Sequence, residues 1–410
     1  MKRKDFEIMA PVGSWESLTA AIQAGANSVY FGVDRLNMRS QSTLNFTFED
    51  LEQIVAQCEK NKVKTYLTLN TVMYDQDIPL MQDLIEAAKK NKVNAIIASD
   101  MAAINYANSR KVEVHISTQV NVSNLEAVKF YAKFADVIVL ARELSLLQIA
   151  HMAKAIEDEH ICGPYGKPIK LELFVHGALC MAISGKCYLS LHEYNKSANR
   201  GGCLQLCRRS YIVTDKESKK ELEIDNQYIM SPKDLCTIDF INKVLEAGVK
   251  VLKIEGRARS PEYVKTTVAC YNEAVNAYLE GTFDKTKIDL WKQRLSGVFN
   301  RGFWDGYYLG RTVGEWSNVY GSMATKKKIY VGKGLNYFSK LKVAEFLVES
   351  DSLKVGDEIL ITGPTTGVIE SKIAEIRVDL QSVNEAKKGE RFSIPLDLQI
   401  RRSDKLYKMV

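Results

Sequence analysis

The chain has 410 residues, enough for two or three domains of ordinary size. A composition of 46% hydrophobic and 26% charged residues excludes a wholly disordered chain, and the apolar runs are far shorter than the roughly 18 residues of a membrane span. The net charge is +6, and no apolar segment follows the basic start Met1–Lys4, so we expect a cytoplasmic protein with no secretory signal and no membrane partner.

Strand-like runs alternate with helix-like segments over residues 1–280. The runs are Phe6–Pro11, Ser28–Gly32, Lys64–Asn70, Ala95–Ser99, Val112–Ser117, Asp136–Ala141, Lys170–His176 and Lys250–Glu255. Eight strands that alternate with helices predict a (β/α)8 TIM-like barrel, an α/β fold, with a doubly wound open sheet as the alternative. Pro11 and Gly13 stand where a G-x-G-x-x-G motif would begin, which argues against a dinucleotide site.

Local signals mark where several helices begin. Ser14 is a candidate N-cap of the first helix, and Pro261 suits the first turn of a later one. A hydroxyl residue followed three positions later by a carboxylate forms a capping box. Such pairs are Thr47 with Asp50, Ser123 with Glu126, and Ser231 with Asp234, the last with Pro232 in the first turn. The last box predicts a helix that begins at Ser231 and carries Cys236 in its first turns.

The seventh strand–helix unit breaks the alternation. No clear helix follows His176 before Ser231, which leaves an insertion over residues 177–230. A loop of that length in a compact domain usually carries function. In a barrel this insertion projects from the face where the carboxyl ends of the strands meet, which is the usual catalytic face.

Two segments follow the barrel. Residues 281–325 are predicted to form a helical connector with aromatic turns, and short strand-like runs broken by Gly, Pro, Asp and Asn predict a small all-β barrel domain over residues 326–410. The aromatic residues of the connector either stack an unpaired base or form an interdomain core. They are Phe303, Trp304, Tyr307 and Tyr308.

Positive charge is distributed unevenly along the chain. Residues 186–220 have a net charge of +5 and residues 326–410 a net charge of +4, which leaves −3 for the remainder. Such basic regions are either ordinary solvated surface or contacts for a phosphate-rich partner such as RNA.

The eight cysteines divide into two groups. Cys58, Cys162 and Cys270 lie in helix-like stretches or in a turn and are expected to be unrelated thiols. The other five predict a metal or cluster site, and they are Cys180, Cys187, Cys203, Cys207 and Cys236. Four thiolates suit a [4Fe–4S] cluster or a tetrahedral zinc ion, and the spacing fits no zinc template well but leaves both open. We expect the amide end of a helix to favour the Cys236 thiolate.

The run from Glu172 to Ser190 contains a long motif. It is E-x-F-x-x-G, a small and an aliphatic residue, C-x4-G-x-C-x, an aliphatic residue and S. In this motif the sequence resembles the collagenase-like peptidase family, whose catalytic type is unassigned. Pro11–Gly13, Lys253–Arg257 and Phe299–Gly302 also resemble that family, and the likeness extends over the whole chain.

The resemblance implies chemistry other than proteolysis, because better-understood members are similar to hydroxylases of RNA and ubiquinone that carry a [4Fe–4S] cluster. In its length and domain order the chain resembles the prephenate-dependent hydroxylases that convert the tRNA wobble uridine to 5-hydroxyuridine. This implies tRNA as the partner and a prephenate-like organic acid as co-substrate and oxygen donor. It also implies Cys180, Cys187, Cys203 and Cys236 as cluster ligands, with Cys207 as a fifth candidate that replaces Cys203 or lies behind it.

Polar residues at the strand ends are the catalytic candidates. Arg142 and Arg257 are expected to clamp an organic acid, because a guanidinium binds carboxylates bidentately. Glu255 or His176 would handle protons, and His115 and His176, at the ends of strands, would both point into the barrel mouth. The alternative is structural, with Arg142 paired to Glu143 and Glu255 paired to Arg257 at the rim.

Other functions remain open. A collagenase-like peptidase needs a nucleophile or a metal, but the chain has no H-E-x-x-H or G-x-S-x-G motif, and only Cys180 with His176 offers a nucleophile–base pair. An rRNA or quinone hydroxylation factor and a non-catalytic RNA-binding Fe–S protein are the further alternatives.

Overall fold

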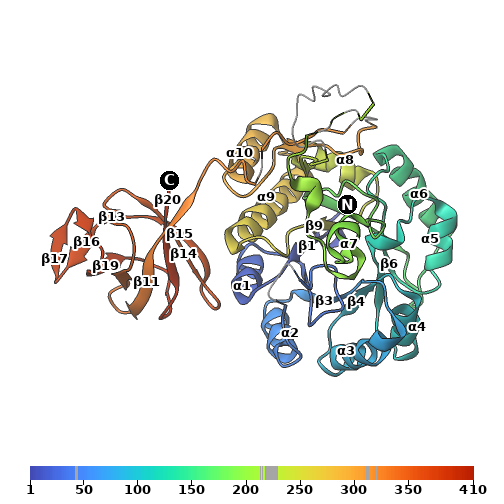
Figure 1. The fold of residues 1–410 in the computed structure, drawn as a ribbon, viewed down its shortest axis with the longest axis horizontal. Coiled ribbons are helices and arrows are strands. Elements are labelled where there is room, and N and C mark those ends of the chain that lie inside the picture. The colour runs from blue at the N-terminus through green and yellow to red at the C-terminus, as the bar shows by residue number, and fades with distance from the viewer. Residues whose placement is uncertain (42–44, 213, 215, 218–229, 311–313, 320) are drawn as a thin grey trace.

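The computed structural model describes every residue except 42–44, 213, 215, 218–229, 311–313 and 320. Its first part is a closed barrel of eight parallel strands (Figure 1). These are β1 Glu7–Pro11, β2 Ser28–Phe31, β3 Lys64–Leu69, β4 Ala95–Ala98, β5 Val114–Ile116, β6 Val137–Val139, β7 Lys170–Gly177 and β9 Val251–Ile254. Because β9 pairs with both β1 and β7, the ring closes, and the predicted TIM-like barrel is confirmed over the open sheet.

Helices surround the barrel on the outside (Figure 1). They are α1 Trp15–Gln23, α2 Asp50–Lys60, α3 Ile78–Lys90, α4 Met101–Ser109, α5 Leu125–Tyr131, α6 Leu146–Asp158, α8 Ile241–Glu246 and α9 Pro261–Leu279. Ser14 caps α1 as predicted, with its hydroxyl accepting from Ser17 N at 3.2 Å. For α5 the predicted cap is wrong by one residue, since Asn124 and not Ser123 accepts from Ala127 N.

The strands are buried on both faces, which explains why they read as almost continuous apolar runs. Their outer side chains pack against the helices in one large core. A separate cluster that includes Met9, Tyr30, Tyr66 and Val137 packs together on the same strands. Among the described helices, none has both the length and the apolar character to cross a bilayer.

The predicted helix from Ser231 is wrong. Residues Asp234–Cys236 instead form a strand, β8, which runs antiparallel to the end of β7 with Gly177 opposite Leu235. The physical reason is that distant segments take the backbone groups a helix would use: Asp234 N donates to Gly302 O at 2.9 Å and Thr237 N to Val175 O at 3.1 Å. Helical structure begins only at Ile238, with α8 following.

The connector packs onto the barrel. It contains α10 Lys285–Ser296 and β10 Phe303–Trp304, which pairs in parallel with β8. Trp304 is 5% and Tyr308 2% exposed, and the Tyr308 hydroxyl donates to Phe174 O at 2.8 Å. These two aromatic residues therefore belong to the packed core and offer no free face to a base.

The last part of the chain is antiparallel β structure with its own core, as expected for an all-β region. Its strands are β11 Lys328–Phe338, β12 Val343–Val348, β13 Leu353–Lys354, β14 Glu358–Gly363, β15 Gly367–Lys372, β16 Ile376–Val378, β17 Gln381–Val383, β18 Glu385–Ala386, β19 Arg391–Pro395 and β20 Lys405–Met409. The β14–β15 hairpin rests on α1, where Gln23 donates to Thr366 O at 2.8 Å and accepts from Val368 N at 3.1 Å. Gly367, between them, has φ +67° and no room for a Cβ against Gln23.

Candidate functional site

A cavity of about 210 Å³ lies at the carboxyl ends of the barrel strands. Residues just after β3, β5 and β9 line one side of it, among them Asn70, Ser117 and Arg257. The segment that follows β7 forms the other side. The insertion predicted over residues 177–230 therefore covers the expected catalytic face, although residues 213, 215 and 218–229 of it lie outside the described part.

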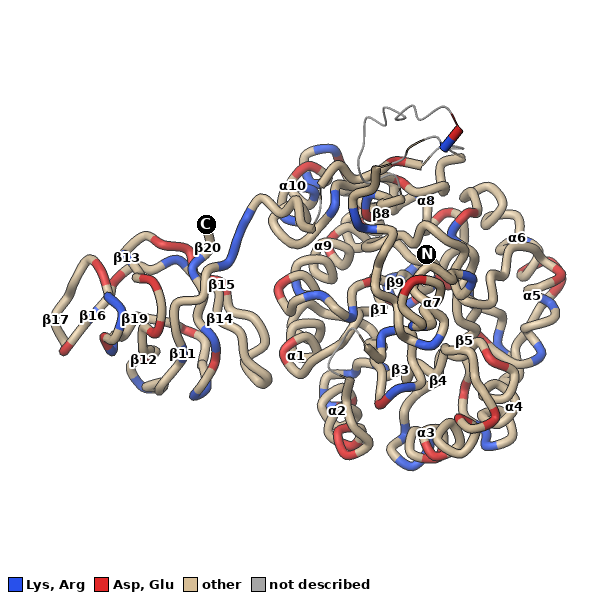
Figure 2. The backbone as a smooth tube through the Cα atoms, in the orientation of Figure 1, with Lys and Arg blue, Asp and Glu red and all other residues tan. Residues whose placement is uncertain are grey.

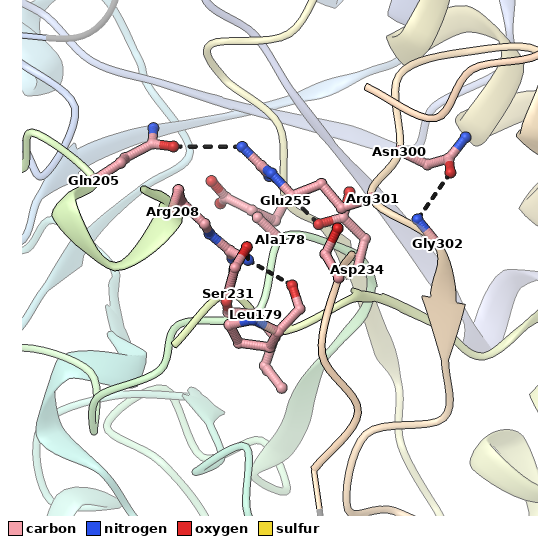
Figure 3. A network of polar contacts seen from close by, with 12 residues as sticks. Ala178, Leu179, Gln205, Arg208, Ser231, Asp234, Glu255, Asn300, Arg301 and Gly302 are labelled. Carbon is pink, nitrogen blue, oxygen red and sulfur yellow. Dashed lines mark hydrogen bonds and ion pairs between the residues drawn. The ribbon is translucent and has the colours of Figure 1, made fainter. Parts of the chain in front are cut away.

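Four of the five clustered cysteines line this cavity, namely Cys180, Cys187, Cys203 and Cys207. A buried guanidinium holds two of their segments together, since Arg208 donates to Leu179 O at 2.6 Å and to Ser231 Oγ at 3.0 Å (Figure 3). Leu179 precedes Cys180 and Arg208 follows Cys207 in the chain. The hydrogen bonds of Arg208 therefore hold Cys180 and Cys207 on the same side of the cavity.

The short helix α7 Leu189–Tyr194 links the other two cysteines and lies over the barrel (Figure 1). It begins two residues after Cys187, and the hydroxyl of Ser190 accepts from Leu204 N at 3.0 Å. Leu204 follows Cys203 directly. One buried serine thus connects the backbone beside Cys203 to the helix beside Cys187.

Cys236, which was expected to join the other cysteines, lies apart from them. It is a β8 residue, 7% exposed, and it is not among the residues that line the cavity. Burial raises the pKa of its thiol to about 12, and Tyr271 is its neighbour. The N–H of Ile238, where helical structure begins, lowers the pKa of this thiol, but burial outweighs it, so the neutral thiol is favoured. The structure brings Cys207, not Cys236, to the other three cysteines.

The four thiols surround the cavity without meeting at one point. Within the described residues, no three Cys, His, Asp or Glu side chains converge as a single-ion site requires. A zinc ion, with Zn–S bonds of about 2.3 Å, needs such convergence. Burial raises the pKa of Cys187 and Cys207, and the positive charge of a bound metal would favour their thiolates.

Cationic side chains dominate the rest of the described lining. They are Arg39, Arg142, Arg208, Lys253, Arg257, Arg259 and Arg301, against the single carboxylate of Glu255. Arg39 forms an ion pair with Glu255 at 2.6 Å. Burial opposes ionisation of Glu255, but the attraction and hydrogen bond of Arg39 outweigh it and lower the pKa of this carboxyl to about 2. Glu255 is therefore a carboxylate at neutral pH.

The two arginines predicted as a clamp both line the cavity. The Arg142 guanidinium lies 4.3 Å from the centre of the Phe174 ring, and its buried Nε has no hydrogen-bond partner among the described residues. Arg257 Nη1 donates to Thr68 Oγ1 at 2.9 Å, and burial lowers its pKa to about 10. The alternative ion pairs of Arg142 with Glu143 and of Arg257 with Glu255 do not form among the described side chains.

Neither predicted histidine reaches the cavity, and its described lining contains no histidine at all. On β7 the register shifts between Phe174 and His176, so Phe174 faces the cavity while His176 packs against Tyr263 and Tyr271. Burial, with a smaller contribution from Arg259, lowers the pKa of His176 to about 3. The expectation that His176 points into the mouth is wrong because local alternation cannot reveal this irregularity.

His115 lies below the cavity, inside the barrel. It is 1% exposed, its ring centre is 4.5 Å from that of Tyr66, and its Nδ1 is 3.8 Å from Glu172 Oε2. Ser117, two residues further along, reaches the cavity instead. His115 therefore does not point into the barrel mouth as expected, but lies one layer of side chains deeper inside the barrel.

Several cations of the site were missed from the sequence. Lys253 carries a signal, because a lysine within the buried strand Val251–Ile254 needs a partner, and it pairs with Glu172 at 2.6 Å. Arg301 bridges Gln205 and Asp234, from the insertion and from β8 (Figure 3). Arg39 and Arg208 lie in irregular segments, where the sequence offers no signal that they meet the cavity.

The sequence model of Peptidase family U32 matches residues 13–318. A Porphyromonas gingivalis (strain W83) protein named "Collagenase" is 62% identical over 100% of this chain and 99% of its own length. The "tRNA hydroxylation protein P1" of Bacillus subtilis is 35% identical over 87% of this chain and 83% of its own. The "23S rRNA 5-hydroxycytidine C2501 synthase" of Escherichia coli is 29% identical over 83% of this chain and 53% of its own.

Proposed function

Because the chain belongs to peptidase family U32, we propose that it hydroxylates a pyrimidine base of RNA, with the wobble uridine of tRNA as the substrate. The relatives named for tRNA hydroxylation and rRNA hydroxycytidine synthesis support an RNA substrate. We propose further that a [4Fe–4S] cluster is the cofactor and that a prephenate-like organic acid is the co-substrate and oxygen donor.

The observation that carries this proposal is the meeting of four thiols and seven cationic side chains in one cavity. Thiolates are the ligands of iron–sulfur clusters, and each binds a different iron of the cubane, so the thiols need not converge on one point. Cys180, Cys187, Cys203 and Cys207 would hold the cluster, which supplies redox chemistry when bound. We leave Cys236 out of the proposed set, because it is buried in β8 and does not line the cavity.

The charged residues of the cavity have separate roles in this proposal. Arg142 and Arg257 are the clamp for the organic acid, since both line the cavity and Arg142 keeps an unused donor at Nε. Glu255 is held ionised by Arg39, so at neutral pH it offers a hydrogen-bond acceptor and no proton to donate, and its low pKa makes it a weak base. The excess of positive charge also favours the phosphates of an RNA that approaches the mouth.

Peptide hydrolysis is the second candidate, because a relative of 62% identity is named a collagenase. The cavity argues against it: its described lining offers thiols but no histidine that could act as their base. Cys180 and His176, the pair available in the sequence, are separated because His176 packs against the tyrosines of α9.

Mass analysis of tRNA nucleosides from a strain that lacks the protein tests the reaction. We expect 5-hydroxyuridine-type modifications to disappear, to return with the wild-type gene and to stay absent with Cys180→Ser. Unchanged modification in the deletion strain contradicts the proposal. Cleavage of gelatin by purified protein that persists in Cys180→Ser and Cys207→Ser would favour the peptidase instead.

A further inference from the structure

A second hollow, of about 710 Å³, opens beside the cysteine cavity. We call it the side groove, and its lining includes Arg35, Tyr74, Asp77, Asn195, Lys196 and Arg200. Consecutive residues face the two hollows: Asn70 lines the cavity and Thr71 the side groove, and Asn199 and Arg200 divide in the same way. Val72 N donates to Asn199 O at 3.1 Å, so the wall between them is one hydrogen-bonded layer of chain. A polymer with one unit in the cavity would therefore bring its neighbouring unit to the side groove.

The side groove contains a rigid aromatic platform. Tyr74 is 53% exposed, and the Arg200 guanidinium lies 3.9 Å from the centre of its ring. Asp77 fixes both residues, because its Oδ2 accepts from Arg200 Nη1 at 2.7 Å and from Tyr74 N at 2.9 Å. A tyrosine ring covered on one side by a fixed guanidinium leaves its other face for a flat ligand.

The side groove also has an excess of positive charge. Arg35 and Lys196 are exposed, and their side chains make no hydrogen bond or ion pair with any described residue. Asp77, the one carboxylate in the described lining, is bound by Arg200 and also interacts electrostatically with Arg35, so the three cations of the lining exceed it by two charges. Figure 2 shows basic positions around α7 at this end of the barrel. The side groove therefore suits a ligand with a flat ring and an anionic link.

We propose that the side groove binds the nucleotide next to the target base in a single-stranded RNA segment. The neighbouring base stacks on Tyr74, and the phosphates on either side of it contact Arg35 and Lys196. This inference rests on the proposed function for the order of the two sites. A peptide fits less well, because the described lining is mainly polar and offers no exposed strand edge to pair with its backbone.

Fluorescence anisotropy with the full chain and a labelled, uridine-free oligoadenylate 12-mer tests the binding. Tyr74→Ala should weaken binding about tenfold, whereas Tyr74→Phe, which keeps the ring, should stay within about twofold of wild type. Arg35→Ala/Lys196→Ala should reduce the slope of log K against log salt by about 1.4, as expected for two phosphates of a single strand. Equal binding by wild type and Tyr74→Ala overturns the inference.

A matched control lies at the end of α5, where Lys133 is placed over the exposed ring of Phe130 at 5.6 Å, and neither residue lines either hollow. Lys133→Ala removes a cation beside an aromatic ring and should change neither the affinity nor the salt slope. If Lys133→Ala reduces the salt slope as much as Arg35→Ala/Lys196→Ala does, the interaction is diffuse and the inference fails. Thermal unfolding of each variant checks that Tyr74→Ala remains folded.

The same variants separate this inference from the proposed function. RNA binding that depends on Tyr74, in a protein that modifies no uridine, supports the side groove and rejects the reaction. Uridine hydroxylation with the same kcat/KM in wild type and Tyr74→Ala supports the reaction and rejects the side groove. A proline-containing peptide whose cleavage, but not RNA binding, falls in Tyr74→Ala rejects RNA as the occupant.

Discussion

Lys253 donates from Nζ to Glu172 Oε1 over 2.6 Å inside the barrel, and both side chains are almost fully removed from solvent. The ammonium also lies 4.7 Å from the centre of the Tyr30 ring and 5.4 Å from that of Phe174. Because Lys253 lines the cavity and Glu172 does not, this pair places a positive charge at the floor of the site and its counter-charge beneath it.

We expect Lys253→Met to lower the free energy of unfolding by about 3–5 kcal/mol, since it leaves Glu172 buried without its partner. The double variant Lys253→Met/Glu172→Met removes both charges and should recover much of that loss. Urea denaturation of the two variants and the wild type measures the difference. A double variant no more stable than the single one would show that packing, and not the unpaired charge, accounts for the loss.

The choice between Cys207 and Cys236 predicts opposite outcomes for two substitutions. Cys207→Ser should lose iron, sulfide and visible absorbance, because Cys207 lines the cavity with the other three thiols. Cys236→Ala should retain them, at a cost in stability from the small cavity it leaves. Anaerobic iron and sulfide analysis measures both. Loss of the cluster in Cys236→Ala would restore Cys236 to the ligand set, and colourless protein with stoichiometric zinc would reject the cluster.

Arg142→Lys should raise the KM for prephenate about tenfold, with a smaller effect on kcat. A lysine keeps the charge but cannot stack on Phe174 or present two parallel donors to a carboxylate. Steady-state tRNA hydroxylation measures the two constants. Arg110→Lys is the control, because Arg110 pairs with Glu86 on the surface with 44% of its side chain exposed. Equal constants in wild type and Arg142→Lys would remove Arg142 from the clamp.

The buried His176 is expected to make the free energy of unfolding depend on pH. Burial lowers the pKa of this histidine from 6.5 to about 3, so between these values the unfolded chain binds a proton that the folded chain does not. The contribution of His176 to stability is therefore fully present above pH 6.5 and falls by about 1.4 kcal/mol per pH unit below it, until the folded pKa is reached. Denaturation of wild type and His176→Gln at pH 7 and pH 5 tests this. Identical pH dependence in both proteins would assign the acid sensitivity to other groups.

The barrel could be predicted from sequence because its signals are local. Strands buried on both faces read as apolar runs, and every run from Phe6–Pro11 to Lys250–Glu255 contains a barrel strand. The gap after His176 likewise located the segment that covers the strand ends. The cysteine cluster was visible as composition, since thiols crowded into one insertion need no alignment to be noticed.

What failed depends on partners that lie far away in the chain. Ser231 and Asp234 satisfy the local rule for a helix start, but Gly302 O takes the backbone N–H of Asp234 and draws the segment into a strand. The pairing of β7 with β9 shifts register before His176, which turns this side chain away from the cavity. Cys236 of β8 pairs with His176 of β7, so Cys236 is also held away from the cavity. These displacements come from strand pairing, which the spacing of residues within one segment does not encode.

β7 and β9 are hydrogen-bonded neighbours, although most of the cysteine-bearing segment lies between them in the chain. The chain therefore leaves the barrel at the end of β7 and returns to it at the neighbouring strand β9. The backbone hydrogen bonds between these two strands involve no cysteine. The backbone bonds that close the ring therefore do not depend on Cys180, Cys187, Cys203 or Cys207, which line the cavity above it. Possession of the barrel does not by itself specify a reaction.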